Sequence, residues 1–281
     1  MNSPELADFP LNDGTRLPAV GFGTSGLRGR EGLTAFRSAL EAGYRYVDSA
    51  VNYGNEAEVG EAVRTSGLDR EHLLVATKVP GRDHAKDRAV RSVEDSLRTM
   101  GLDYLDMVLI HWPNPSRDLY VQAWEGLVEA RERELVRSIG VSNFTSEHLD
   151  RIIDATGVTP SLNQIEMHPY FTQVHMRGDH ADRGVLTQSW SPLGKGTVPF
   201  DEPAIAAAAE RHDVTPGQVI LRWHLHLGAQ PLPKSGNPAR QAQNLDLAGF
   251  ALTDEEVAAI SALTRADGRR FGGDPNTHEE M

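Results

Sequence analysis

Four polar side chains follow three consecutive apolar segments and could together form an acid–base system. Asp48 ends one strand-like segment, and Tyr53 lies in the loop just beyond it. Lys78 lies near the end of the next such segment, and His111 lies at the end of the one after that. If the segments are neighbouring parallel strands, their carboxyl ends meet at one edge and bring these four side chains together.

The chemistry that suits this set is proton transfer to a carbonyl oxygen. A phenol titrates near pH 10 and is a weak acid at neutral pH. We expect a buried ammonium at Lys78 to stabilise the phenolate and so to lower the pKa of Tyr53. Asp48 would keep that ammonium charged, and a neutral imidazole at His111 would orient and polarise the carbonyl.

Each residue also has a purely structural interpretation. Asp48 could cap a helix, Lys78 could be a solvated charge, His111 could be a core histidine and Tyr53 could pack in a loop. Their joint placement favours function. No metal is expected, because the chain has no His-Glu-x-x-His motif, and His224 and His226 are two residues apart, so they do not share a helical face.

The elements that must position these residues alternate between strand-like and helical segments. The strand-like segments are Ala19–Thr24, Tyr44–Ala50, Leu73–Val79, Met107–Trp112, Val136–Val141, Leu162–Met167, Val185–Trp190 and Gln230–Pro233. Helical spacing follows each of them, and such alternation predicts a parallel sheet. Eight units over 281 residues predict one α/β domain, a (β/α)₈ TIM barrel spanning the chain.

Additions are expected at both ends of the barrel. Asp13-Gly14 predicts an N-terminal β-hairpin, because this pair supplies the positive φ angles of a tight turn. The spacing of Thr253 and Glu256 predicts a capping box at the start of an extra C-terminal helix. The tail from Arg265 to Met281, rich in Gly and charge, is expected to be a loop.

Composition narrows the class of protein. The formal net charge is -12, which argues against nucleic acid or an anionic membrane as the main partner. There is no cysteine, so disulfides, thiolate nucleophiles and thiolate metal sites are excluded. No signal peptide and no apolar stretch long enough for a membrane span are evident, so a cytoplasmic location is expected.

A competing motif lies near the N-terminus. Gly21-Phe22-Gly23-Thr24-Ser25-Gly26 fits the G-x-G-x-x-G pattern of Rossmann folds, and Asp48 follows at the spacing of their ribose-binding acid. That motif requires a helix to open at its third glycine. Here Leu27–Gly32 delays the helix, so we favour a loop at the top of the first barrel strand.

Longer segments resemble the aldo-keto reductases. The matching segments are Gly43–Ala50 continuing to Tyr53–Glu56 and Val59-Gly60, Ser138–Phe144, Asn163–Pro169 and Leu232–Ser235. They occur in family order over nearly the whole chain. The family usually has His where this chain has Tyr46. The segment Ser189–Gly194 resembles the bacterial 2,5-diketo-D-gluconate reductase-like members, which share the Trp found here at position 190.

The resemblance implies a role for each matching residue. The catalytic tetrad would be Asp48, Tyr53, Lys78 and His111, and the substrate pocket would be rimmed by Thr24, Ser25, Trp112 and the tail around Phe271. The nicotinamide would contact Ser142, Asn143, Gln164 and Trp190, with Ser191 and Leu193 beside them. The 2′-phosphate would contact Lys234, Ser235 and Arg240, and the adenosine would face Gln243 and Asn244. The implied cofactor is NADPH.

Local chemistry agrees with a phosphate site. Asn237-Pro238 predicts an N-cap followed by Pro at the first helical position, so a helix N-terminus would lie beside two cations. The family usually has Glu where this chain has Gln243, which leaves open how strongly NADPH is preferred over NADH.

Three functions are compatible with these patterns. The favoured one is a monomeric NADPH-dependent reductase of small carbonyl compounds such as aldehydes, α-dicarbonyls and keto-sugars, with Tyr53 as the general acid. The second is a non-catalytic nicotinamide-binding regulatory subunit. The third is a Schiff-base aldolase that uses Lys78.

Overall fold

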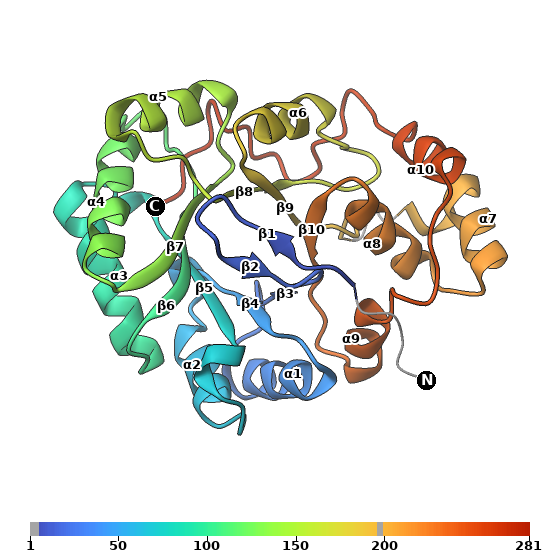
Figure 1. Ribbon diagram of the computed structural model, residues 1–281, viewed down its shortest axis with the longest axis horizontal. Helices are drawn as coiled ribbons and strands as arrows, with labels where there is room; N and C mark the ends of the chain where they lie inside the picture. Colours follow the sequence, from blue (N-terminus) through green and yellow to red (C-terminus); the bar gives the residue numbers. More distant parts are fainter. Residues whose placement is uncertain (1–5, 196–198) are drawn as a thin grey trace.

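The structure is a computed structural model that describes residues 6–195 and 199–281, and its centre is a closed barrel (Figure 1). Within these residues, eight parallel strands form one sheet in sequence order. They are β3 (Phe22–Gly23), β4 (Tyr46–Asp48), β5 (Leu74–Val79), β6 (Leu105–Ile110), β7 (Val136–Ser142), β8 (Leu162–Glu166), β9 (Leu186–Trp190) and β10 (Ala229–Leu232). The predicted (β/α)₈ barrel is therefore confirmed.

Backbone hydrogen bonds close the barrel between its first and last strands. Gly21 N donates to Pro231 O and Gly23 N donates to Pro233 O, both at 3.1 Å. The first two glycines of the Rossmann-like motif thus form the seam between β3 and β10. The Rossmann interpretation is excluded by this topology, although the following helix begins at Gly29, only three residues after Gly26.

Helices surround the sheet as expected (Figure 1). They are α1 (Gly29–Ala42), α2 (Glu56–Arg64), α3 (Lys86–Met100), α4 (Tyr120–Glu132), α5 (Ser146–Thr156), α6 (Val174–Asp182), α7 (Pro203–His212), α8 (Pro216–His226), α9 (Pro238–Leu245) and α10 (Asp254–Ser261). The capping box at Thr253 and Glu256 is present. The sequence did not predict the short 3₁₀ turns η1 (Val51–Tyr53), η2 (Arg70–His72), η3 (Gly81–Asp83) and η4 (Pro199–Asp201).

A buried histidine explains how the polar helix α6 packs. His180 is the buried residue of this helix. Its Nδ1 lies 2.8 Å from Thr187 Oγ1, and its Nε2 lies 2.9 Å from Asn163 Nδ2. Burial lowers the pKa of His180 to about 4, so the ring is neutral and joins α6 to β8 and β9 through hydrogen bonds.

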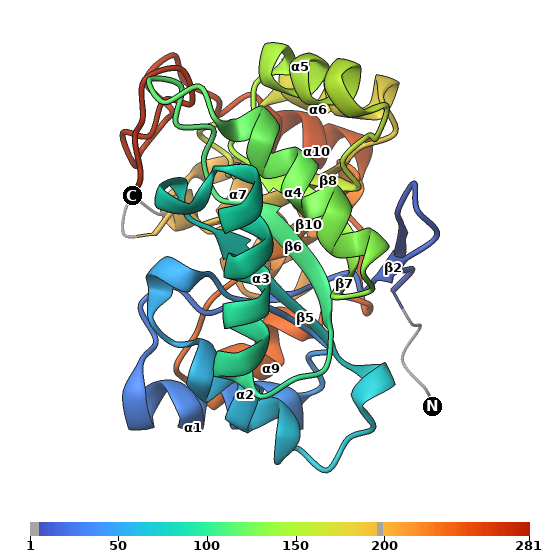
Figure 2. The same cartoon turned by 90° about the vertical axis from the view of Figure 1, so that its left-hand side faces the viewer.

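The N-terminal hairpin closes one end of the barrel. Its strands β1 (Phe9–Pro10) and β2 (Arg16–Leu17) are antiparallel, as predicted. Leu11 and Leu17 pack into the apolar cluster inside the barrel. Figure 2 shows the hairpin at one end of the molecule and the tail after α10 at the opposite end. The open end therefore lies at the carboxyl ends of the strands.

The tail is irregular, as expected, but it is anchored by hydrogen bonds. Arg265 N donates to Tyr170 O at 3.0 Å, and Arg270 N donates to Glu166 Oε1 at 2.7 Å. It therefore belongs to the wall of the open end. Within the described part of the chain, none of the helices has the length and apolar character that crossing a membrane requires.

Candidate active site

A cavity of about 430 Å³ opens among the loops at the carboxyl ends of the strands. Its lining includes these residues singled out from sequence: Thr24, Ser25, Asp48, Tyr53, His111, Trp112, Ser142, Asn143, Gln164, Trp190, Ser191, Leu193, Lys234 and Phe271. Residues from many βα junctions thus share one space. Lys78, Ser235, Arg240, Gln243 and Asn244 lie outside this lining.

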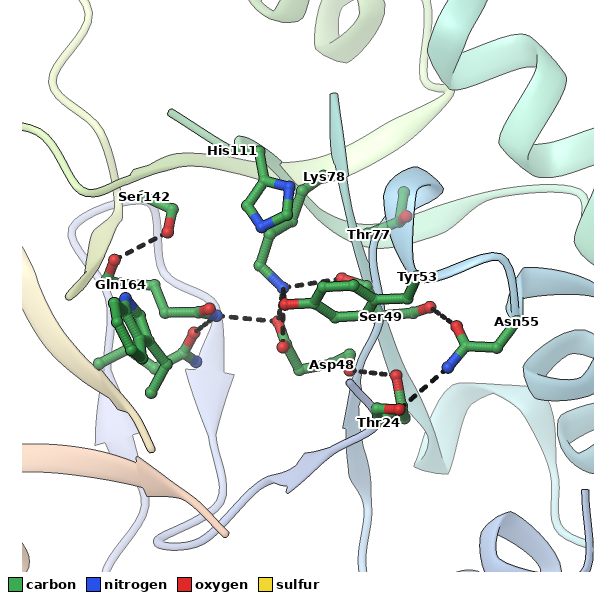
Figure 3. A network of polar contacts seen from close by, with 12 residues as sticks. Thr24, Asp48, Ser49, Tyr53, Asn55, Thr77, Lys78, His111, Ser142 and Gln164 are labelled. Carbon is green, nitrogen blue, oxygen red and sulfur yellow. Dashed lines mark hydrogen bonds and ion pairs between the residues drawn. The ribbon is translucent and has the colours of Figure 1, made fainter. Parts of the chain in front are cut away.

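A buried ion pair lies beneath the cavity (Figure 3). Lys78 Nζ donates to Asp48 Oδ1 at 2.8 Å, to Asp48 Oδ2 at 2.7 Å and to Ser49 O at 2.8 Å. Burial by itself lowers the pKa of Lys78, but Asp48 and Tyr53 raise it, and the net pKa is above its usual value. A buried, fully engaged ammonium is a poor amine nucleophile, which disfavours the aldolase interpretation.

Tyr53 points its hydroxyl toward this ammonium. The 3₁₀ turn η1 carries Tyr53 directly after β4, and Lys78 Nζ donates to Tyr53 Oη at 3.4 Å. Burial raises the pKa of Tyr53, Lys78 lowers it, and Asp48 raises it again, so that the net pKa is above 10. Lys78 thus lowers the pKa of Tyr53 as expected. The expected net lowering of this pKa is wrong, because burial outweighs the effect of Lys78.

His111 lies beside Tyr53 in the cavity wall. The two rings are edge to face with centroids 5.6 Å apart. The Nε2 edge of His111 points toward the Tyr53 hydroxyl, as Figure 3 shows. Asn143 Nδ2 donates to His111 O at 3.1 Å, which fixes the backbone that carries the imidazole.

A polar patch of hydroxyl and amide groups continues from this centre over β7 and β8. Ser142 Oγ donates to Gln164 O at 2.8 Å, and Gln164 Nε2 donates to Asp48 Oδ1 at 2.8 Å. Trp190 Nε1 donates to Asn143 Oδ1 at 2.8 Å, which fixes the indole beside the patch. The patch offers polar groups and a flat apolar surface to a ring that carries an amide.

A row of glutamines links this patch across the barrel interior. Gln164 Nε2 donates to Gln188 Oε1 at 2.6 Å, and Gln188 Nε2 donates to Gln230 Oε1 at 2.6 Å. Gln230 in turn donates to Pro18 O at 2.6 Å. The sequence analysis missed Gln188 and Gln230. Polar residues inside otherwise apolar strand segments are the signal that could have found them.

The predicted phosphate site surrounds the start of α9. The Asn237 side chain accepts from Arg240 N, and Pro238 is the first helical residue, which confirms the predicted cap. Lys234 and Arg240 are exposed, and among the described residues neither side chain has an ion-pair or hydrogen-bond partner. Two exposed cations at a helix N-terminus fit a phosphate group well.

The predicted substrate residues differ in their burial and in the contacts that they already make within the protein. Thr24 is fully buried, and its Oγ1 already donates to Asp48 O at 2.9 Å. The ring of Trp112 packs on His278 of the tail at 4.1 Å between centroids. Lys195 and Phe200, which the sequence analysis did not name as site residues, also line the cavity. Within the described residues no group of acidic or His side chains could hold a metal ion.

The chain matches known proteins over nearly its whole length. Residues 19–265 match the model of the Aldo/keto reductase family. The chain is 51% identical to a 2,5-diketo-D-gluconic acid reductase B of Corynebacterium sp. (strain SHS752001) over 278 residues, which cover 99% of this chain and 100% of the relative. It is 42% identical to the methylglyoxal reductase DkgA of Escherichia coli (strain K12), covering 95% of this chain and 96% of that one.

Solved structures agree with the fold. A crystal structure of a Gox0644 mutant in complex with NADPH has a TM-score of 0.93 at 41% identity, covering 98% of this chain and 100% of that one.

Proposed function

The chain belongs to the aldo/keto reductase family, and from that premise we propose that it reduces small aldehydes and ketones to alcohols with NADPH. The substrates we favour are α-dicarbonyls and keto-sugars. Two relatives, a 2,5-diketo-D-gluconic acid reductase and a methylglyoxal reductase, support these classes. The observation that carries the proposal is Tyr53, at the wall of a cavity, with its hydroxyl on a buried Lys78–Asp48 pair.

The proposed mechanism assigns one task to each group around Tyr53. NADPH, when bound, supplies a hydride to the carbonyl carbon. Tyr53 delivers the proton that converts the carbonyl oxygen to a hydroxyl. Lys78 stabilises the resulting phenolate, and Asp48 compensates the buried ammonium. His111 donates to the carbonyl oxygen and holds it near Tyr53.

The described residues fit the proposed cofactor at both of its ends. Ser142, Asn143, Gln164 and Trp190 form the patch that would take the nicotinamide, with Ser191 and Leu193 beside it. The exposed cations Lys234 and Arg240, with Ser235, would take the 2′-phosphate. Gln243 is exposed and Asn244 is buried on the same helix, toward the proposed adenosine.

A substrate panel tests the proposed activity. NADPH oxidation at 340 nm is expected with methylglyoxal, phenylglyoxal, a nitrobenzaldehyde and 2,5-diketo-D-gluconate, since the cavity is large enough for small carbonyl compounds. Tight NADPH binding without turnover of any of them would contradict the reductase proposal and favour a nicotinamide-binding regulatory subunit.

The cations at α9 give a second prediction. Replacing Lys234 or Arg240 by Ala is expected to raise the KM for NADPH by roughly 10- to 100-fold, because each variant loses a charge-assisted contact of about 1.5–3 kcal/mol. The KM for NADH should change little. Steady-state kinetics with both cofactors checks this. Arg98→Ala, an exposed cation in the last turn of α3, is the control. Equal losses with NADH and NADPH would contradict a 2′-phosphate role.

We also propose a domain organisation, an oligomeric state and a location for the protein. It is one barrel domain over residues 1–281 that acts as a cytoplasmic monomer. The family resemblance supports this, and the net charge of -12 favours repulsion between copies.

A further inference from the structure

Glu280, near the end of the tail, places a carboxylate behind the ring of His111. Its Oε1 lies 2.9 Å from His111 Nδ1, and the two side chains are only 18% and 10% exposed. These two atoms are within ion-pair distance. His111 lines the cavity and Glu280 does not, so the carboxylate lies outside the substrate space.

Loops after three neighbouring strands hold this part of the tail. The hydrogen bonds run from Asn52 Nδ2 to Met281 O (3.0 Å), from Ser116 N to Glu279 Oε1 (2.8 Å) and from Asn114 Nδ2 to Glu280 O. Gly81 leaves the necessary room, because a Cβ built there would lie 2.0 Å from Glu280 O. The position of Glu280 is therefore fixed by several independent contacts.

The charge of Glu280 is retained at neutral pH. Burial raises the pKa of this carboxyl, but the contact with His111 lowers it, and Asn52 and Lys78 lower it further. The net pKa is below its usual value. An ionised carboxylate therefore faces Nδ1 throughout the neutral range.

This contact limits the protonation states in which His111 can bind a carbonyl. A neutral imidazole has one N–H donor and one bare nitrogen, and the proton goes where its acceptor lies. A carboxylate at Nδ1 draws the proton there and leaves Nε2 as an acceptor, which cannot bond to a carbonyl oxygen. Only a ring protonated on both nitrogens satisfies Glu280 and the substrate together.

We propose that Glu280 is a positioning residue that keeps His111 doubly protonated, so that Nε2–H donates to the substrate carbonyl. This inference rests on the reductase function proposed above and replaces the neutral imidazole expected from sequence. A donor that carries a positive charge makes the stronger hydrogen bond to an oxygen on which negative charge develops.

Other charged groups around His111 do not supply this effect. The titratable and charged groups on the surrounding elements are Asp48, Tyr53, Lys78, His84, Arg117 and Glu279. The carboxylate of Asp48 is bound to Lys78, and that of Glu279 accepts from Ser116 N. Burial and Arg117 lower the pKa of His84 to about 4, so it is neutral. Glu280 is the carboxylate among these groups that contacts Nδ1.

The test compares Glu280→Gln with Glu279→Gln, which removes an adjacent tail carboxylate that does not contact His111. In isotopically labelled apo protein, the NMR titration of His111, assigned with a His111→Asn variant, should move to lower pH by roughly 1 unit in Glu280→Gln. It should stay unchanged in Glu279→Gln. Gly81→Ala, which forces the tail away, should move it in the same direction as Glu280→Gln.

Kinetics gives an independent measurement. In Glu280→Gln the kcat/KM should fall about tenfold at pH 8 and much less at pH 6. The reason is that the imidazole of the variant should lose its second proton at a lower pH than the imidazole of the wild type. An unchanged titration in Glu280→Gln would overturn the proposal. So would a lower KM at every pH, since the tail would then obstruct the substrate. The NMR measurement uses neither NADPH nor substrate, so it stands even if no carbonyl is reduced.

Discussion

Replacing Tyr53 by Phe is expected to lower kcat for carbonyl reduction by roughly 10²- to 10⁴-fold while NADPH still binds. The substitution removes only the hydroxyl that Lys78 contacts at 3.4 Å. Lys78 lies outside the cavity lining and keeps its three bonds to Asp48 and Ser49, so the fold and cofactor site should persist. Stopped-flow turnover and NADPH fluorescence titration measure the two effects separately.

The direction of the Tyr53 pKa makes a pH dependence part of the same prediction. Its pKa is raised above 10, so the phenol holds its proton throughout the neutral range and loses it only in more alkaline solution. A loss of wild-type activity between pH 7 and pH 9 must then come from a group other than Tyr53.

Tyr104→Phe is the matched control. Tyr104 lies between the guanidinium groups of Arg70 and Arg137, 4.1 Å and 4.0 Å from its ring centroid, and it does not line the active-site cavity. The same chemical change there should leave kcat unchanged. If Tyr53→Phe retained more than about a tenth of wild-type kcat, another group would have to deliver the proton.

The fold was predictable because its signals are local. Apolar runs such as Met107–Ile110 are buried on both faces and are typical of parallel strands. Capping residues such as Thr253 indicate where the next helix begins. Closure of the sheet into a barrel was predicted from the number of strand–helix units alone. The seam itself depends on Gly21 and Gly23 meeting Pro231 and Pro233 more than 200 residues later, which no local pattern encodes.

Candidate residues in the site were predictable to the same extent. Asp48, Lys78 and His111 stand at or next to strand ends, where barrel topology decides what lies together. Glu280 was missed because the tail has no periodicity, and only its contacts with three distant loops place it. The net pKa of Tyr53 was also misjudged, since the depth of burial is a property of the packed structure.

Replacing Lys78 by Met is expected to reduce both stability and turnover. The variant leaves the Asp48 carboxylate buried, with Gln164 Nε2 as its remaining side-chain donor. Loss of one partner of a buried ion pair costs about 3–5 kcal/mol of unfolding free energy. Without the ammonium the Tyr53 phenolate is not stabilised, so kcat should fall by roughly 10²-fold or more. Chemical denaturation and steady-state kinetics measure these losses.

A double variant separates the two roles of the pair. Asp48→Asn combined with Lys78→Met removes both buried charges, so it should be more stable than either single variant, with a coupling of roughly 2 kcal/mol or more. It should remain inactive, because an amide and a thioether cannot stabilise a phenolate. If the single Lys78→Met variant lost less than about 1 kcal/mol, the cost of an unpaired buried carboxylate would be absent, and the pair could not be buried as described. If the double variant regained turnover, the charge of Lys78 would not be what allows Tyr53 to release its proton.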